Sequence, residues 1–138
     1  MLLKTFRSKT AITKPLDVLP VFKALLDNTD EADKDREHLY VAGLDGRNTV
    51  KYVELVSLGT LNASLVHPRE TFRLAITRAC AGIICCHNHP SGDCTPSEDD
   101  LEITKRLVDS GKLLGIEVLD HIIMGKNSFL SFKDKGLI

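Results

Sequence analysis

The chain of 138 residues lacks the features that mark membrane, secreted and repeat proteins. No apolar run approaches the ~20 residues that a membrane-spanning helix requires. The apolar start over residues 1–3 is too short for a signal peptide. Internal repeats, low-complexity tracts and convincing linkers are also missing. We therefore expect a cytoplasmic protein without a membrane partner, with room for one domain but not for two.

Cysteine is scarce, and its spacing excludes two further classes. The four cysteines contain no C-x-x-C pair, and Cys85 and Cys86 are adjacent. Neither a disulfide framework nor a zinc ribbon fits this arrangement. We interpret Cys80, Cys85 and Cys86 as small buried hydrophobic residues.

The chain also lacks an excess of charge of either sign. Its net charge is -1, whereas DNA-binding proteins usually show a basic balance or a basic face. Net charge therefore gives no electrostatic support for a nucleic-acid partner. Basic residues gather near the N-terminus, where we interpret them as part of a solvated arm: Lys4, Arg7, Lys9 and Lys14.

What remains is an ordinary globular composition, 43% hydrophobic and 27% charged. Helical spacing of apolar residues predicts helices at 18–26, 68–81 and 95–110. Apolar and β-branched runs predict strands at 37–44, 49–58, 82–86, 116–124 and 128–132. This order predicts an α/β fold with a mixed sheet flanked by helices. Residues 1–19 are expected to form a loosely structured N-terminal arm, and residues 20–138 the folded domain.

The helix predicted at residues 95–110 has a well-marked start and end. Thr95 is a good N-cap, Pro96 suits the first helical position, and Glu98 can close a capping box with Thr95. Gly111 is a natural stop for this helix.

Two histidines follow the strand predicted at residues 82–86. Alternate residues of a strand point to the same side, so His87 and His89 can aim two imidazole rings at one point. Pro90 and Gly92 turn the chain directly afterwards, which leaves that point open at the edge of the sheet. The carboxyl ends of strands are where open α/β sheets usually bind their ligands.

The following helix offers a carboxylate to the same point. Asp100 projects from the middle of an apolar face formed by Leu101, Ile103, Leu107 and Val108. An inward carboxylate is costly unless a cation or hydrogen-bond donors meet it. Because Thr95 and Glu98 already supply a capping box, we interpret Asp100 as a metal ligand rather than as a residue that only favours the helix N-terminus. Together with His87 and His89 it would leave one position open on a tetrahedral zinc ion, as in catalytic sites.

An open zinc site needs a general base for its water. Glu37 and Glu54 are both candidates, because each interrupts the apolar pattern of a predicted strand. The alternative for either is a surface carboxylate at the edge of a strand, and the residues alone do not choose. Ser97 lies one turn before Asp100, so its hydroxyl can donate to a developing oxyanion near the metal. The alternative is an ordinary serine of the first helical turn.

The spacing His87-x-His89-Pro90, six residues, then Ser97-x-x-Asp100 resembles the motif of the JAMM (MPN+) zinc metallopeptidases at every position. The segments 67–70, 87–92 and 120–123 look like the RadC-type branch of that superfamily. The resemblance covers roughly residues 20–138 and rests on several separate blocks in the same order.

This resemblance implies a cytidine-deaminase-like α/β/α fold. It also implies a zinc ion on His87, His89 and Asp100 with a water in the fourth position. Of the two glutamates, Glu37 best matches the place of the family's general base, although Glu54 also belongs to a RadC-type block. The role of the motif serine falls on Ser97.

The resemblance to JAMM enzymes implies a zinc-dependent hydrolase of amide bonds, acting on a peptide or protein. The second hypothesis is a DNA-repair-associated or nucleic-acid accessory factor of the RadC type, with little or no peptidase activity. RadC-type proteins commonly carry an N-terminal helical domain similar to helix-hairpin-helix modules, and we expect no such domain within these 138 residues. A third hypothesis is a metal-bearing scaffold without turnover.

Overall fold

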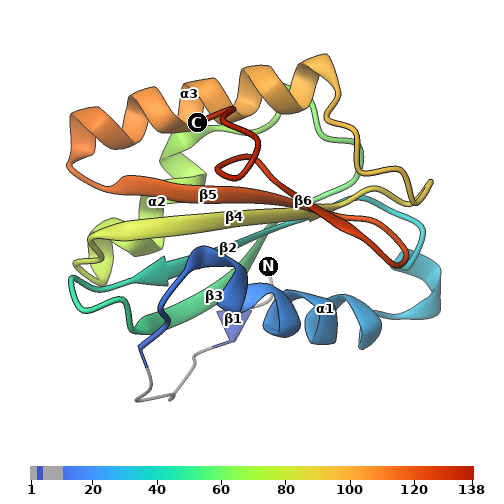
Figure 1. The fold of residues 1–138 in the computed structure, drawn as a ribbon, viewed down its shortest axis with the longest axis horizontal. Coiled ribbons are helices and arrows are strands. Elements are labelled where there is room, and N and C mark those ends of the chain that lie inside the picture. The colour runs from blue at the N-terminus through green and yellow to red at the C-terminus, as the bar shows by residue number, and fades with distance from the viewer. Residues whose placement is uncertain (1–2, 5–10) are drawn as a thin grey trace.

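The computed structural model describes residues 3–4 and 11–138. Six strands form one sheet in the order β1-β3-β2-β4-β5-β6 (Figure 1). The strands are β1 (Leu3–Lys4), β2 (His38–Leu44), β3 (Val50–Leu58), β4 (Gly82–Asn88), β5 (Glu117–Met124) and β6 (Phe129–Ser131). The helices are α1 (Leu19–Asp27), α2 (Pro68–Thr77) and α3 (Glu98–Leu114), with short 3₁₀ helices η1 (Pro15–Val18) and η2 (Glu31–Asp33).

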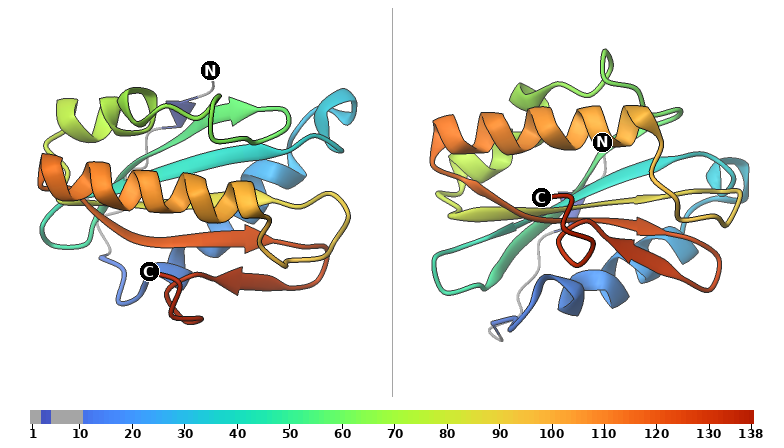
Figure 2. Two further views of the ribbon diagram at one scale, coloured as in Figure 1. Left: turned by 90° about the horizontal axis from the view of Figure 1, so that it is seen from above. Right: turned by 45° about the horizontal axis from the view of Figure 1, so that its top comes forward.

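The sheet is mixed and lies between helices. β2 pairs antiparallel with both β3 and β4, β4 pairs parallel with β5, and β6 returns antiparallel to β5. α2 and α3 cover one face of the sheet, and α1 covers the other (Figure 2). The predicted α/β fold with a mixed sheet flanked by helices is therefore confirmed. The parallel connection from β4 to β5 crosses over through α3, which brings the start of that helix to the carboxyl end of β4.

Hydrophobic clusters fill both sides of the sheet. Adjacent residues of β4 point to opposite faces, so Cys85 joins the cluster beneath α2 and α3, whereas Cys86 joins the cluster beneath α1. Both thiols are buried and free, as is that of Cys80, which confirms their interpretation as small hydrophobic residues. β2 is buried along its whole length because it is a central strand with helices on both faces.

Part of the stretch expected as an N-terminal arm carries regular structure. Ala11 forms an isolated bridge with Thr49, and η1 directly precedes α1. Val18 is buried in the cluster beneath α1. Residues 1–2 and 5–10, which include Arg7 and Lys9 of the basic group, lie outside the described residues.

The start of α3 differs from the prediction. Its N-cap is Ser97: the Ser97 hydroxyl accepts from the Asp100 N–H (3.0 Å), and the Asp100 carboxylate accepts from the Ser97 N–H (2.9 Å). The predicted Thr95–Glu98 capping box is wrong, because the Thr95 N–H and hydroxyl both bind the Asp93 carboxylate instead. Asp100 therefore closes the capping box itself. The capping role that the sequence assigns to Thr95 and Glu98 belongs to Ser97 and Asp100.

The end of α3 also differs from the prediction. The helix passes Gly111 and ends at Leu114, with Gly115 in the left-handed conformation (φ 73°) as its C-cap. Gly111 serves close packing instead, since a Cβ there would collide with the Ile116 carbonyl oxygen.

Among the helices within the described ranges, none has both the length and the apolar character for a membrane crossing.

Candidate metal centre

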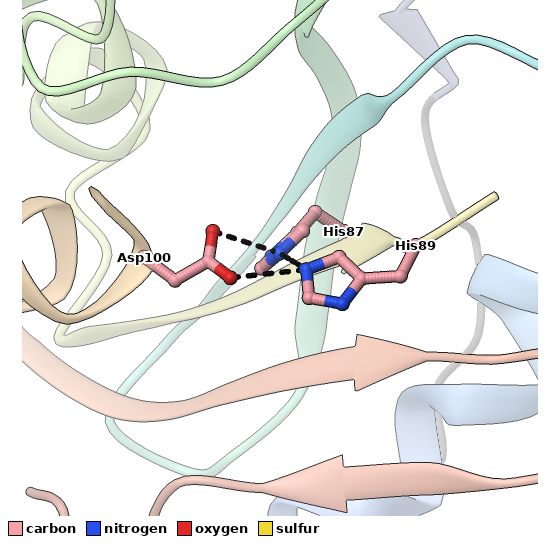
Figure 3. A group of neighbouring side chains, drawn as sticks. All are labelled: His87, His89 and Asp100. Carbon is pink, nitrogen blue, oxygen red and sulfur yellow. Dashed lines mark hydrogen bonds and ion pairs between the residues drawn. The ribbon is translucent and has the colours of Figure 1, made fainter. Parts of the chain in front are cut away.

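His87, His89 and Asp100 meet at the carboxyl end of β4 (Figure 3). β4 extends to Asn88, so His87 belongs to the strand, His89 directly follows it, and Asp100 lies in the first turn of α3. His87 Nε2 lies 3.0 Å from His89 Nε2 and 3.2 Å from Asp100 Oδ1, and His89 Nε2 lies 3.0 Å from Asp100 Oδ2. His87 and Asp100 are buried and His89 is half-buried. The structure thus brings together the three residues that the sequence predicts as ligands.

These distances fit ligand atoms around a small metal ion. On a tetrahedral zinc ion with bonds of about 2.0–2.1 Å, neighbouring ligand atoms are about 3.3 Å apart. The three distances between side chains, 3.0–3.2 Å, are close to this value. Two imidazole nitrogens and one carboxylate are also a donor set that zinc favours, and three protein ligands leave a fourth position open.

Hydrogen bonding leaves a lone pair of His89 facing the other two side chains. Nδ1 of His89 lies 2.8 Å from the backbone oxygen of Asp93, in a turn that the chain makes through Gly92 (φ 90°). Because a carbonyl oxygen only accepts, Nδ1 is the donor. The neutral ring therefore keeps its lone pair on Nε2, which is the form that binds metals.

Asp100 and His89 shift each other's pKa values. Burial alone would raise the pKa of Asp100, but the imidazole rings of His87 and His89 beside it hold the pKa of this carboxyl far below its ordinary range. The hydrogen bond to Asp100 is also the main cause that raises the pKa of His89. A positive charge beside Asp100 is therefore favoured. Protons and a metal ion would compete for the same lone pairs, so metal affinity is expected to fall at low pH.

Glu37 lies beside the three side chains. It immediately precedes β2 and lines one cleft together with His89, Ser97 and Asp100. The side chain is half-buried, and its Oε2 accepts a hydrogen bond from the Leu61 N–H at 3.3 Å. Its position suits a group that exchanges protons with a molecule in the cleft.

Asn88 holds the backbone on both sides of Glu37. Its side chain is buried; Oδ1 accepts from the His38 N–H (2.6 Å), and Nδ2 donates to the Arg36 carbonyl oxygen (3.1 Å). Asn88 stands between the two histidines in sequence, so the same short segment carries two predicted ligands and anchors the predicted base.

Glu54 lies elsewhere. It is in β3, where it pairs with Val41 of β2, whereas His87 pairs with Leu39 of the same strand. Glu54 is thus two strands away from His87 and displaced along the sheet. Its buried carboxylate binds the guanidinium of Arg73 from α2 at 3.2 Å. The residues that line the cleft do not include Glu54.

Ser97 lines the cleft as the N-cap of α3. Its oxygen accepts from the Asp100 N–H, which leaves the hydroxyl hydrogen free to be donated to a bound molecule. The Ser97 oxygen therefore caps the helix, and the hydroxyl hydrogen is the part that the predicted oxyanion role would use.

Three residues near the centre have no predicted role from the sequence. Asn88 could have been found by strand alternation, because a residue between two inward histidines must point to the other face. Thr104 follows Asp100 by one helical turn and so shares its inward face. His121 falls in the RadC-type block 120–123, but its place beside His87 depends on the parallel register of β4 and β5.

The mixed sheet and the converging side chains define the class of this protein as an α/β domain of the JAB (MPN) type. A family model described as a RadC-like JAB domain matches residues 12–137, and the chain therefore belongs to this family. The RadC-type assignment made from the motifs is confirmed. The JAB superfamily includes hydrolases.

The curated relatives are similar over most of this chain. The chain is 55% identical over 109 residues to the UPF0758 protein of Desulforamulus reducens, which covers 79% of this chain and 48% of that protein. UPF0758 proteins of Listeria welshimeri (54% over 101 residues; 73% and 45%) and Bacillus cereus (54% over 103 residues; 75% and 46%) match similarly. The chain spans about half the length of these relatives. Their names state no activity.

Proposed function

We propose that this domain is a zinc-dependent hydrolase of amide bonds, of the metallopeptidase or isopeptidase type. One observation supports the proposal: the predicted ligands His87, His89 and Asp100 converge at one point, and His89 and Asp100 line a cleft together with Glu37. A metal site alone would be compatible with a structural role. A free carboxylate in the same cleft is what a hydrolytic site needs in addition.

When bound, zinc would supply a water of lowered pKa, near 7, and polarise the substrate carbonyl. Glu37 takes a proton from the attacking water, whose oxygen forms the new bond to the carbonyl carbon. The same carboxyl then gives that proton to the nitrogen as the C–N bond breaks. Ser97 donates its hydroxyl hydrogen to the carbonyl oxygen as negative charge develops there.

The substrate class follows from this chemistry. Protonation of a leaving amine suits amide bonds, and a cleft open to solvent accommodates a peptide or a modified lysine of a protein. A peptide or protein is therefore the proposed partner. The nucleic-acid accessory role remains the alternative for this domain.

Zinc titration of chelator-stripped protein tests the proposal. We expect one zinc ion per chain by calorimetry, and zinc-dependent cleavage in a panel of peptides and isopeptide-linked substrates. Asp100→Ala is expected to lose both, while circular dichroism verifies its fold. A folded wild-type chain that binds no zinc would overturn the proposal. Zinc-loaded protein that cleaves nothing in the panel but binds DNA in a salt-dependent way would favour the alternative.

A further inference from the structure

We infer that Thr104 and His121 form a hydrogen-bond relay that sets the orientation and the tautomer of His87. They act as positioning residues, and the inference rests on the proposed metal centre. The relay runs from the Asp100 carbonyl oxygen through Thr104 and His121 to His87. It would present the Nε2 lone pair of His87 to the point that His89 and Asp100 face.

The donors and acceptors of the relay can be assigned from Thr104 onward. Its Oγ1 lies 2.7 Å from the backbone oxygen of Asp100, one turn earlier in α3. A carbonyl oxygen only accepts, so the single hydroxyl hydrogen of Thr104 is used there. The second contact of Oγ1, to His121 Nδ1 at 2.6 Å, must therefore be one in which the hydroxyl oxygen accepts and Nδ1 donates.

The donor and acceptor of the hydrogen bond between His121 and His87 follow in the same way. Its ring is buried, and its two nitrogens face Thr104 and His87, neither of which is a carboxylate that would stabilise a charged ring. The neutral ring with hydrogen on Nδ1 keeps a lone pair on Nε2. That lone pair lies 2.7 Å from His87 Nδ1, so His87 donates from Nδ1 and retains its own lone pair on Nε2.

Packing holds His121 in place for this role. Its ring stacks on Phe132, with centroids 4.8 Å apart and planes inclined by 20°. Asp120 accepts from the His121 N–H (2.7 Å) and the Lys133 N–H (3.0 Å), and the Phe132 N–H binds the His121 carbonyl oxygen (2.9 Å). β5, which carries His121, lies beside β4 (Figure 1). His87 and His121 therefore stand on two paired strands and Thr104 stands on α3, so no member of the relay lies on a loop.

This arrangement gives α3 two links to the metal centre. The helix supplies one ligand directly from Asp100, and one turn later Thr104 orients a second ligand on β4 through His121. Residues that orient metal-binding histidines typically change metal affinity by about 10- to 100-fold when removed. An effect of this size is expected here, although neither Thr104 nor His121 would touch the metal.

Two variants at one position separate the hydroxyl from the packing. Thr104→Val keeps the shape but removes the hydroxyl, and Thr104→Ser keeps the hydroxyl. We expect the zinc dissociation constant to rise about 10- to 100-fold in Thr104→Val, and to stay near that of the wild type in Thr104→Ser. Thermal unfolding of both metal-free variants serves as the control for the fold. Equal zinc affinity in folded Thr104→Val and wild-type protein would overturn the relay while leaving the proposed function in place.

The tautomer of His121 gives a readout that needs neither zinc nor activity. Nitrogen-15 spectra of the histidine rings in metal-free wild-type protein are expected to show His121 with hydrogen on Nδ1. In Thr104→Val that hydrogen loses its acceptor, so we expect a shift toward the form with hydrogen on Nε2. Wild-type His121 with hydrogen on Nε2 would overturn the relay. This measurement decides the matter even if Thr104→Val does not fold, or if the chain binds no zinc.

Discussion

Glu37 and Glu54 stand at the two strands of one hairpin, yet their surroundings differ in almost every respect. Glu37 is half-buried, lines the cleft with His89 and Asp100, and accepts one hydrogen bond from a backbone N–H. Glu54 is only 2% exposed and is bound to Arg73 from α2.

The difference separates a carboxylate suited to chemistry from one suited to structure. A general base needs access to the molecule that it deprotonates and a lone pair that no cation already holds. Among the described residues no cation binds Glu37, which also has access to the cleft. Glu54 is buried away from the cleft and binds Arg73. Four predictions test this contrast, beginning with the largest expected effect.

Substitution of the two glutamates by glutamine is the most direct comparison. Glu37→Gln removes the proposed proton acceptor, so amide hydrolysis is expected to fall about 10²- to 10⁴-fold. Zinc binding should persist, because Glu37 is not among the three converging side chains. Glu54→Gln, assayed in parallel for cleavage and zinc content, should keep hydrolysis near the wild-type rate. The reverse pattern would move the role of base to Glu54.

Loss of the Asn88 side chain should change the position of Glu37 indirectly, through the backbone of its two neighbours. Asn88→Ala removes the hydrogen bonds to the His38 N–H and the Arg36 carbonyl oxygen, so the segment that carries Glu37 is freed to move. Displacement of a catalytic group by about 1 Å can cost about 100-fold in rate, and we expect a loss of 10- to 100-fold on that basis.

The measurement for Asn88→Ala is the rate of cleavage at saturating zinc, beside the zinc affinity. Asn28→Ala, at the exposed C-cap of α1, is a matched asparagine control, because within the described part of the chain its side chain binds only the Ala24 carbonyl oxygen of the same helix. Unchanged cleavage in a folded Asn88→Ala variant would show that Glu37 does not depend on this anchor.

The partner of Glu54 should matter for stability rather than for activity. Arg73→Met removes the guanidinium and leaves a buried carboxylate without its cation, which is expected to lower the free energy of unfolding by about 1–3 kcal/mol. The double variant Arg73→Met/Glu54→Gln should recover much of this loss, since no buried charge remains. Urea unfolding of metal-free wild-type protein, Arg73→Met, Glu54→Gln and the double variant measures the free energy of unfolding of each. A double variant as unstable as Arg73→Met would contradict the role assigned to Glu54.

Much of the site could be predicted from the sequence because its signals are local. The two-residue spacing of His87 and His89 at a strand end, and the inward phase of Asp100 on a helix, need only the periods of strand and helix. The choice between Glu37 and Glu54 is different. It depends on which strands are neighbours and in what register, and only the family resemblance favoured Glu37 beforehand.

The errors have an equally local cause. Two overlapping segments, Thr95 to Glu98 and Ser97 to Asp100, both have the spacing of a capping box, and the sequence does not reveal that Asp93 already binds Thr95. Gly111 looks like a helix end until the close approach of the Ile116 carbonyl oxygen is known. In both cases a contact with a residue only two to five positions away decides the outcome.

The smallest expected effect is a pH dependence of stability that belongs to Glu54. Burial raises the pKa of this carboxyl, and Arg73 offsets that only in part. In the unfolded chain the carboxyl has an ordinary pKa near 4.5, so it loses its proton at a lower pH there than in the folded protein. The protonated group therefore contributes stability below pH 4.5, and this contribution is lost as pH rises through the folded-state pKa.

We expect the stability of wild-type protein relative to Glu54→Gln to fall as pH rises from 4 to 7, measured by urea unfolding of metal-free protein. A relative stability that rises over this range would mean that Arg73 outweighs burial and that the carboxylate form of Glu54 is favoured in the fold.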